Sequence, residues 1–328
     1  MAEVFYTVSG NLHRMARIEE GRVVSLDFEF QDKSLSLLGG IYDGRVVEIQ
    51  KPLHVAFVEV GLSKPGMLPL KEGNLPLLKH GDRVLVQVSR TENPLENKGV
   101  RLTRLITLSL GSLLYTPFKS GLSLSRRLEN RQLFKDLLTL EPGEGGILRH
   151  NARPEENFQQ NLIQLREEWK EIQKKREGPP LTLLERAMRS LTPSDHFTRV
   201  KTFDDRCEDA WESLSSPEIS LPKGGNIYIE ETHSLTVIDV NSQGALHYVL
   251  PFNRMAIEEA FRQITLRELG GKIVIDLIRP PQDINPCLKG LSVPTDTEIW
   301  GLSPMGLLEL TRRRKRLSLP QRLKLQLN

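Results

Sequence analysis

The sequence has few cysteines and no long apolar run. Its two cysteines, Cys207 and Cys287, lie far apart. That spacing excludes a disulfide framework and a cysteine-based zinc cluster, and it favours a reducing cytoplasm as the compartment. No stretch approaches the ~20 apolar residues that a membrane span needs. The N-terminal segment carries Glu3 and lacks the apolar core of a secretory signal, so we expect a cytoplasmic protein with no membrane partner.

Neither positive nor negative charge is in large excess. The formal net charge is only +3, which permits a polyanionic partner without identifying one. Apolar residues make up 38% and charged residues 27% of the 328 positions, as in an ordinary globular protein. A chain of this length is too long to fold around one small hydrophobic core, so two to four structural units are expected.

The first third of the chain reads as short strands. Residues 1–35 alternate weakly between apolar and polar positions and predict a few N-terminal strands. Residues 36–116 are more regular, with alternating segments separated by Gly and Pro. Five short strands in roughly 80 residues predict a small β-barrel.

The middle of the chain changes to helical spacing. The segments 125–140 and 154–178 both carry apolar residues at steps of three or four, and 179–222 begins with another helical piece after Pro179-Pro180. In the second segment the stripe consists of Phe158, Leu162, Leu165, Trp169 and Ile172.

From residue 223 the pattern is strand, helix, strand. "GGNIYIEET" and "SLTVIDVNS" predict two strands, and "KIVIDLI" predicts a third after a helix over residues 255–269. Asn253 is the expected N-cap of that helix, and Gly270-Gly271 its expected end. This alternation predicts an α/β layer.

Two of these apolar strands run into a carboxylate, at Asp239 and Asp276. Asn241 shares a strand face with Asp239, because side chains alternate along a strand. If the two strands are neighbours, the carboxylates lie close together at the carboxyl edge of the sheet, where α/β proteins bind ligands. Oxygen ligands without a nearby thiol or imidazole favour Mg²⁺, with Mn²⁺ as the alternative. The competing interpretation is that each Asp only begins a turn.

These stretches resemble the ribonuclease E/G family of bacterial endoribonucleases. The resemblance rests on "GGNIYIEETHSLTVIDVNS", "FRQITLRELGGKIVIDLI" and "GLLELTRRR", in that order, and on the barrel segment "IYDGRVVEIQKPLHVAFVEVGLSKPGMLPLKEG". It covers most of the chain and indicates a compact member with a shortened middle. It implies an OB-fold RNA-binding barrel and a catalytic α/β domain.

The resemblance also implies roles for individual residues. Asp239 and Asp276 match the two metal-holding catalytic aspartates, and Asn241 matches an assisting asparagine. The expected RNA contacts on the barrel are Phe57, Met67 (where the family has a second aromatic) and Lys98. From the residues alone, Phe57 is equally well explained as a barrel core residue.

Long members of the family also recognise a 5′-monophosphate. The matching positions are Arg149, His150 (where threonine is expected) and the loop glycine Gly121. The histidine departs from the pattern and predicts a weakened sensor. The family's zinc-binding Cys-Pro-x-Cys link is absent, so no zinc-bridged dimer is expected and the oligomeric state stays open.

Two further features bear on function. After Asp276 the family has a long basic helix, which Pro280, Pro281 and Pro286 disfavour here. The densest basic run, residues 311–316, supplies candidate phosphate contacts at Arg312, Arg313 and Arg314. Such runs are often only solvated surfaces.

Together these features predict an α+β multidomain protein. The expected parts are N-terminal strands (1–35), an inserted OB-fold barrel (36–116), a 5′-sensor-like segment (117–178), a reduced RNase H-like connector (179–222) and a C-terminal α/β nuclease layer carrying the metal site (223–328). The expected activity is Mg²⁺-dependent endonucleolytic cleavage of single-stranded RNA. The alternatives are an RNA-binding protein with little or no catalysis and, less favoured, a DNA-acting metal nuclease.

Overall fold

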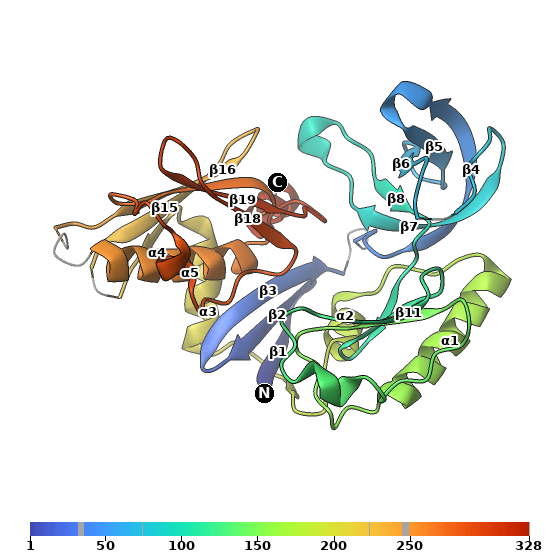
Figure 1. Ribbon diagram of the computed structural model, residues 1–328, viewed down its shortest axis with the longest axis horizontal. Coiled ribbons are helices and arrows are strands. Elements are labelled where there is room, and N and C mark those ends of the chain that lie inside the picture. The colour runs from blue at the N-terminus through green and yellow to red at the C-terminus, as the bar shows by residue number, and fades with distance from the viewer. Residues whose placement is uncertain (32–35, 74, 223, 245–248, 328) are drawn as a thin grey trace. The chain divides into compact units, whose positions relative to one another are not determined.

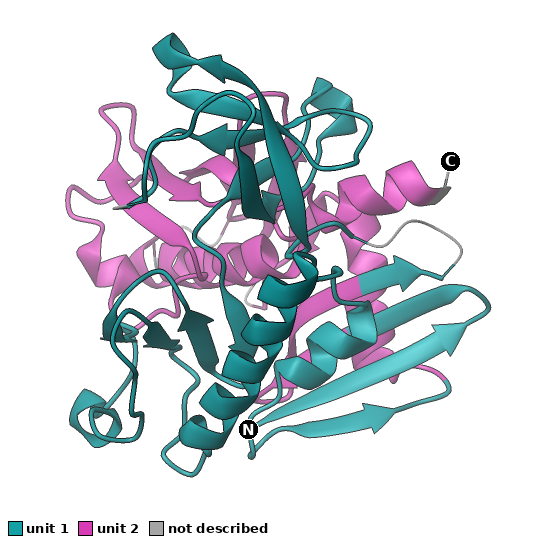
Figure 2. Ribbon diagram, turned by 90° about the vertical axis from the view of Figure 1, so that its right-hand side faces the viewer, with its two compact units in different colours: residues 1–15, 28–201 teal, residues 16–27, 202–328 magenta. Residues whose placement is uncertain are grey.

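The computed structural model describes residues 1–31, 36–73, 75–222, 224–244 and 249–327 (Figure 1). The chain divides into two compact units, coloured separately in Figure 2: residues 1–15 with 28–201, and residues 16–27 with 202–328. The fold is mixed α/β, with one closed barrel and several sheets. The predicted segment boundaries at residues 35 and 223 lie outside the described residues. Within the described ranges, no helix is both long and apolar enough to cross a membrane.

The predicted β-barrel is present in the first unit. Five strands close it in the order β4-β5-β6-β8-β7. They are β4 (Ile41–Gln50), β5 (Val55–Glu59), β6 (Gly66–Pro69), β7 (Arg83–Arg90) and β8 (Arg101–Thr103), with short 3-10 helices at Lys51–Leu53 and Pro94–Glu96. The alternation that predicted the strands also fills the interior, because Ala56, Val58 and Leu68 point inward and are fully buried.

A second sheet of the first unit carries the longest helix of that unit. Its strand order is β11-β12-β10-β9, from Gly121–Leu124, Gly145–Leu148, Leu113–Thr116 and Leu108–Leu110. Helix α1 (Phe158–Lys175) packs on it through the predicted stripe, whose five residues are all buried. The predicted range 36–116 therefore spans the barrel strands and the first two strands of this sheet.

The predicted helix over 125–140 is wrong. This segment forms only a 3-10 helix at Arg131–Phe134, preceded by Asn130 in the left-handed region at φ 47°. Leu128, Phe134 and Leu138 are buried in the core of the second sheet. Their helical spacing reflects separate anchoring points of an irregular segment, because tertiary packing overrides a short local pattern.

The N-terminal strands form a third sheet in the order β13-β1-β2-β3. Its strands are β1 (Ala2–Ser9), β2 (Leu12–Glu19), β3 (Arg22–Phe30) and β13 (His196–Arg199), and the boundary between the two units falls within β2 and β3. Helix α2 (Leu183–Arg189) follows Pro180 and begins with a capping box in which Thr182 and Glu185 bond each other's backbone N–H.

The second unit contains a six-stranded sheet in the order β14-β15-β16-β17-β19-β18. The strands are Glu218–Ser220, Asn226–Glu231, Thr236–Asn241, Gly271–Asp276, Leu307–Arg312 and Thr297–Leu302, respectively. Helix α4 (Val249–Leu266) covers one face and buries Phe252, Ile257, Phe261 and Ile264 against it (Figure 1). The remaining helices are α3 (Asp205–Glu212), a 3-10 helix (Ser213–Ser215), α5 (Asn285–Leu288) and α6 (Leu319–Leu327).

The predicted strand, helix, strand unit is confirmed, but the start of its helix is not. Helix α4 includes Val249, so Asn253 lies inside the helix and not at its N-cap. The Asn253 side chain is fully buried, donates to the carbonyl of Ile278 (2.8 Å) and accepts from its N–H (3.2 Å). Asparagine often caps helices, but here its side-chain amide satisfies the N–H and the C=O of one backbone residue at the same time.

Candidate functional site at the carboxyl ends of two parallel strands

Asp239 and Asp276 are direct neighbours in the sheet. Strands β16 and β17 run parallel, with Ile238 opposite Ile275 and Asp239 opposite Asp276. Neighbouring strands lie about 4.8 Å apart, and both aspartates are the first exposed residues after a buried isoleucine. The two carboxylates therefore project side by side from the face of the sheet opposite α4.

The alternation along the strands decides which side chains join this pair. Val240 returns to the core, whereas Asn241 is exposed beside Asp239 and donates from Nδ2 to its Oδ2 (2.8 Å). Tyr228 of β15 lies opposite Asp239 in the antiparallel pairing and is also exposed. The amide thus orients one oxygen of Asp239 and leaves its own carbonyl oxygen as a further donor atom.

Asn253 bonds the backbone shortly after the other carboxylate. Its two bonds to the backbone of Ile278 fix the chain two residues after Asp276, from a helix that packs on the opposite side of the sheet. Sequence reasoning missed this role, because an Asn before an apolar helical pattern is ordinarily a cap. The only available signal was that Asn253 occupies a position of the helix that the apolar pattern places in the core.

The segment after Asp276 is short and irregular, as its prolines predict. Pro280 and Pro281 precede α5, which has only four residues and carries Pro286 within its first turn. Leu277, Ile284 and Cys287 of this segment are buried in the core that α4 covers.

The donor set suits a hard divalent cation. Two carboxylates and one amide oxygen are oxygen ligands, the type that Mg²⁺ selects, and Mg²⁺ ordinarily keeps several waters in addition. Among the described residues, no cluster of three or more His, Cys, Asp or Glu is arranged to hold a metal ion. Asp239 and Asp276 would hold such an ion, and water or phosphate oxygens would complete its coordination.

On the barrel, Phe57 and Met67 share the outer surface. They are cross-strand partners in β5 and β6, and both are half-buried, while Ala56 and Val58 fill the core. Arg101 of β8 lies opposite Met67 and is exposed. This row of an aromatic ring, a thioether and a guanidinium crosses three adjacent strands. The Phe57 side chain is therefore not a fully buried residue of the barrel core.

Lys98 lies in the loop before β8. Its side chain is 60% exposed and forms an ion pair with Glu96, two residues earlier. The backbone around it is held by the bridge between Asn93 and Lys98. A surface ion pair of this kind contributes little to stability, so Lys98 can exchange Glu96 for another anion.

The three positions matched to the 5′ sensor lie on or directly after one pair of neighbouring strands, β11 and β12. Gly121 pairs with Gly145 at the start of the parallel strands β11 and β12, whereas Arg149 and His150 follow the end of β12. Four residues of strand separate these two ends, about 13 Å at the usual rise. Gly121 adopts φ 92°, which explains the glycine by backbone conformation.

The basic run is largely engaged within the second unit. Arg312 donates to the carbonyls of Ile264 and Leu269 at the end of α4, and Arg314 donates twice to the carbonyl of Gly270. Arg313 is exposed. Two of the three candidate phosphate contacts thus stabilise the carboxyl end of a helix, where cations are favoured.

An aspartate accompanies this run. Burial would raise the pKa of Asp296, but its 2.6 Å ion pair with Lys315 and the nearby Arg312 and Arg313 outweigh burial and lower the pKa.

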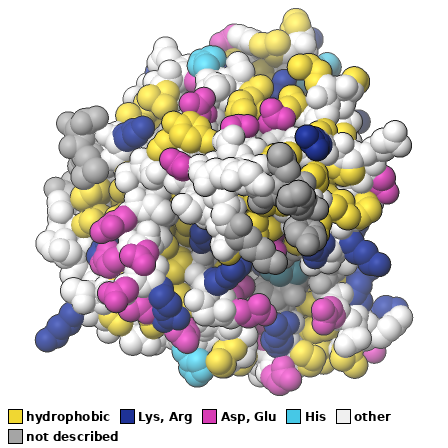
Figure 3. All heavy atoms as spheres, turned by 90° about the vertical axis from the view of Figure 1, so that its left-hand side faces the viewer, with side chains coloured by type: hydrophobic (Ala, Val, Ile, Leu, Met, Phe, Trp, Pro, Cys, Tyr) yellow, Lys and Arg dark blue, Asp and Glu magenta, His cyan; other side chains and the backbone are white. Residues whose placement is uncertain are grey.

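On the face drawn in Figure 3, Lys and Arg side chains are interspersed with Asp and Glu. No broad basic surface is visible there.

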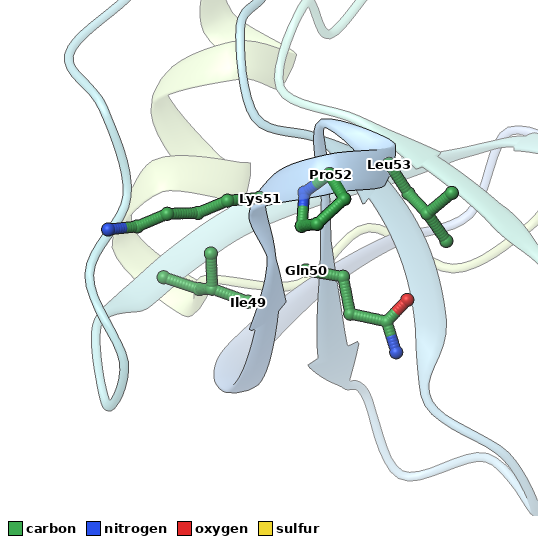
Figure 4. Close-up of a pocket in the computed structure, with 5 residues that line it drawn as sticks. All are labelled: Ile49, Gln50, Lys51, Pro52 and Leu53. Carbon is green, nitrogen blue, oxygen red and sulfur yellow. The ribbon is translucent and has the colours of Figure 1, made fainter.

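A hollow on the barrel carries none of the predicted residues. It is lined by the consecutive residues Ile49–Leu53 at the end of β4 and the following 3-10 helix (Figure 4). Gln50 and Lys51 supply its only polar side chains. Because it lacks a set of converging polar groups from different elements, we assign it no chemistry.

Comparison with known proteins gives one family match and several named relatives. Residues 196–315 match the model of the ribonuclease E/G family, a range that contains both aspartates. This match and the relatives named below support the resemblance to the ribonuclease E/G family that the sequence predicts.

Individual relatives show how much of such proteins the chain spans. It is 28% identical to ribonuclease E of Haemophilus influenzae over 92% of this chain and 40% of that protein, and 30% identical to ribonuclease E of Synechocystis over 85% of this chain and 52% of that protein. It is 26% identical to ribonuclease G of H. influenzae, over 97% of this chain and 80% of that protein. The chain thus spans about half or less of the ribonuclease E relatives.

Proposed function

We propose that this chain is an endoribonuclease that cleaves single-stranded RNA and depends on Mg²⁺, or alternatively Mn²⁺, held by Asp239 and Asp276. The observation that carries the proposal is their direct pairing on parallel strands, with both side chains exposed on one face. The names of the relatives, ribonucleases E and G, support the activity.

Each residue of the site has a distinct task in this proposal. A bound Mg²⁺ would supply charge stabilisation at the scissile phosphate and lower the pKa of water. Asp239 and Asp276 hold the ion, Asn241 keeps the Asp239 carboxylate oriented, and Asn253 fixes the backbone that leaves Asp276. The exposed face of the sheet leaves room for the RNA backbone.

The barrel would grip the strand. Its five-stranded closed topology fits the proposed OB fold, which binds single strands by base stacking and charge. Phe57 and Met67 form the proposed stacking surface, with Lys98 as a phosphate contact. Of the basic run, Arg313 is the residue whose exposure suits RNA, whereas Arg312 and Arg314 hold the end of α4.

The test of this proposal is a cleavage assay on unstructured RNA with and without Mg²⁺. Mg²⁺-dependent cleavage of RNA, but not of the same DNA sequence, is the expected result, and products should carry a 5′-phosphate. Tight RNA binding without cleavage at any Mg²⁺ concentration would instead establish the RNA-binding alternative. Equal cleavage of DNA would establish a general metal nuclease.

Phe57→Ala should weaken binding of single-stranded RNA by ~1–3 kcal/mol, because a base loses its stacking partner. Its effect on stability should be smaller than the ~3–5 kcal/mol typical of a buried Phe, because the ring is only half-buried. Fluorescence anisotropy with labelled RNA and urea unfolding of the same samples measure the two effects. An unchanged affinity in the folded variant would remove Phe57 from the RNA surface.

The 5′ end should matter little. A working guanidinium–phosphate contact would be worth roughly tenfold or more in discrimination. Because His150 stands where the family has threonine, we expect 5′-monophosphate and 5′-hydroxyl substrates to be cleaved at rates within roughly threefold of each other. A large preference for the monophosphate that disappears in Arg149→Ala would show a functioning sensor.

A further inference from the structure

Two exposed aromatic side chains lie on the same open face as the aspartate pair, one on each side of it. Tyr228 is 38% and Trp300 63% exposed. Across the sheet the order is Tyr228 on β15, Asp239 on β16, Asp276 on β17, then β19, and Trp300 on the edge strand β18. These strands span about 19 Å at the usual spacing, a width that a short piece of RNA can cross.

The Trp300 ring is held in place from its polar end. Its Nε1–H donates to Oγ1 of Thr311 on β19 (3.0 Å), and the pairing of β18 with β19 shifts register at Trp300, between Ile299 and Gly301. A register shift of this kind re-aims a side chain. Since its only polar group is satisfied within the protein, the indole offers just its apolar ring to a ligand.

Tyr228 is positioned by the two residues that flank it in β15. Ile227 and Ile229 on either side of it are buried in the core, which forces its ring onto the open face directly opposite Asp239. Cβ atoms of such cross-strand pairs lie about 5 Å apart. A base stacked on this ring therefore belongs to a nucleotide next to the phosphate that the carboxylates face.

Charge alone does not explain what this face binds. Lys272 is exposed opposite Thr311, the residue that bonds Trp300, but Glu298 and Glu309 lie on the same face. With opposite charges mixed, attraction of phosphates would be weak, whereas stacking on aromatic rings works for every base. The mixture of flat rings and modest charge therefore fits unpaired bases of a single strand.

We propose that Tyr228 and Trp300 are base-stacking residues that hold the RNA on either side of the Asp239–Asp276 pair. This inference rests on the proposed nuclease function and deepens it, because it makes the catalytic unit itself a binding surface for the substrate. Without such contacts the scissile phosphate would be positioned by the barrel alone.

The test measures binding of a short single-stranded RNA in EDTA, where no cleavage occurs. Trp300→Ala and Tyr228→Ala should each weaken binding roughly 5- to 100-fold, the loss expected for one stacked base. Trp300→Phe and Tyr228→Phe should retain most of the affinity, since a ring remains. Leu133→Ala, which trims a side chain that is 58% exposed in the other unit, is the matched control and should bind like the parent.

A scan with abasic nucleotides separates stacking from a general loss of structure. Removing one base near the cleavage position should weaken binding to the parent but not further weaken binding to Trp300→Ala. Identical abasic profiles in the two proteins, or parental affinity in both Ala variants, would overturn the proposal and assign these rings to a protein contact. If Trp300→Ala loses affinity while the parent never cleaves with Mg²⁺, stacking stands and the nuclease assignment fails.

Discussion

Asp276→Asn should lower the rate of RNA cleavage by ~100-fold or more, and Asp239→Asn should do the same. Removing one of two ligand charges weakens the hold on the ion and its effect on water and phosphate, which is worth several kcal/mol. RNA affinity should change little, because the barrel and the aromatic rings make most contacts. Cleavage rates across a Mg²⁺ titration and binding in EDTA measure both quantities.

Glu309→Gln is the matched control for this experiment. Glu309 is an exposed carboxylate on the same open face, opposite Val274, two residues along the sheet from the level of Asp276. It should cleave at the parental rate. Neither Asp variant should unfold more easily, since both side chains are exposed. Parental cleavage by both Asp→Asn proteins at limiting Mg²⁺ would mean that the two aspartates are only strand-end residues.

Asp27→Asn should reduce the free energy of unfolding by ~3–5 kcal/mol, because it removes one partner from a buried set of ion pairs. Asp27 is 5% exposed and accepts from Arg316 (2.8 Å) and Arg322 (3.1 Å), and Glu268 accepts from the same two arginines. Burial would lower the pKa of Arg316, but Asp27 and Glu268 outweigh burial and raise it. Without Asp27, two guanidinium groups would share one carboxylate.

Urea unfolding monitored by circular dichroism measures this loss. Glu19→Gln is the control, since its pair with Arg17 lies in the same unit but its side chain is 49% exposed. That change should be worth less than about 1 kcal/mol. If Asp27→Asn is no less stable than Glu19→Gln, the buried charges are compensated by water or by rearrangement of the arginines.

Local pattern predicted the parts of the fold whose signal lies within one element. The apolar stripe of α1 and the strands that carry Asp239 and Asp276 appear where the sequence placed them, although β16 continues beyond Asp239 to Asn241. The same logic failed at 125–140, where the spacing imitates a helix but Leu128 and Phe134 serve an irregular segment. The spacing of apolar residues indicates which side chains are buried. The conformation of the backbone between them depends on how the segment packs against the neighbouring sheet.

Residues that act across elements were harder to predict. Asn253 was misread as a cap because its partner, Ile278, lies on a different element, and Trp300 gave no signal until its strand was shown to share a face with the aspartates. The basic run was predicted to contact phosphates because of its composition. In the structure, Arg312 and Arg314 instead donate hydrogen bonds to backbone carbonyls.

The parallel pairing of β16 and β17 has a consequence for how the protein folds. Parallel strands cannot be joined by a tight turn, so β16 and β17 are connected through the long crossover that contains α4. Contacts that close such a long loop form slowly, since the entropy of closure precedes the gain in contacts. We therefore expect the two carboxylates to come together only when this unit assembles, and a chain truncated between them would carry only one of the pair.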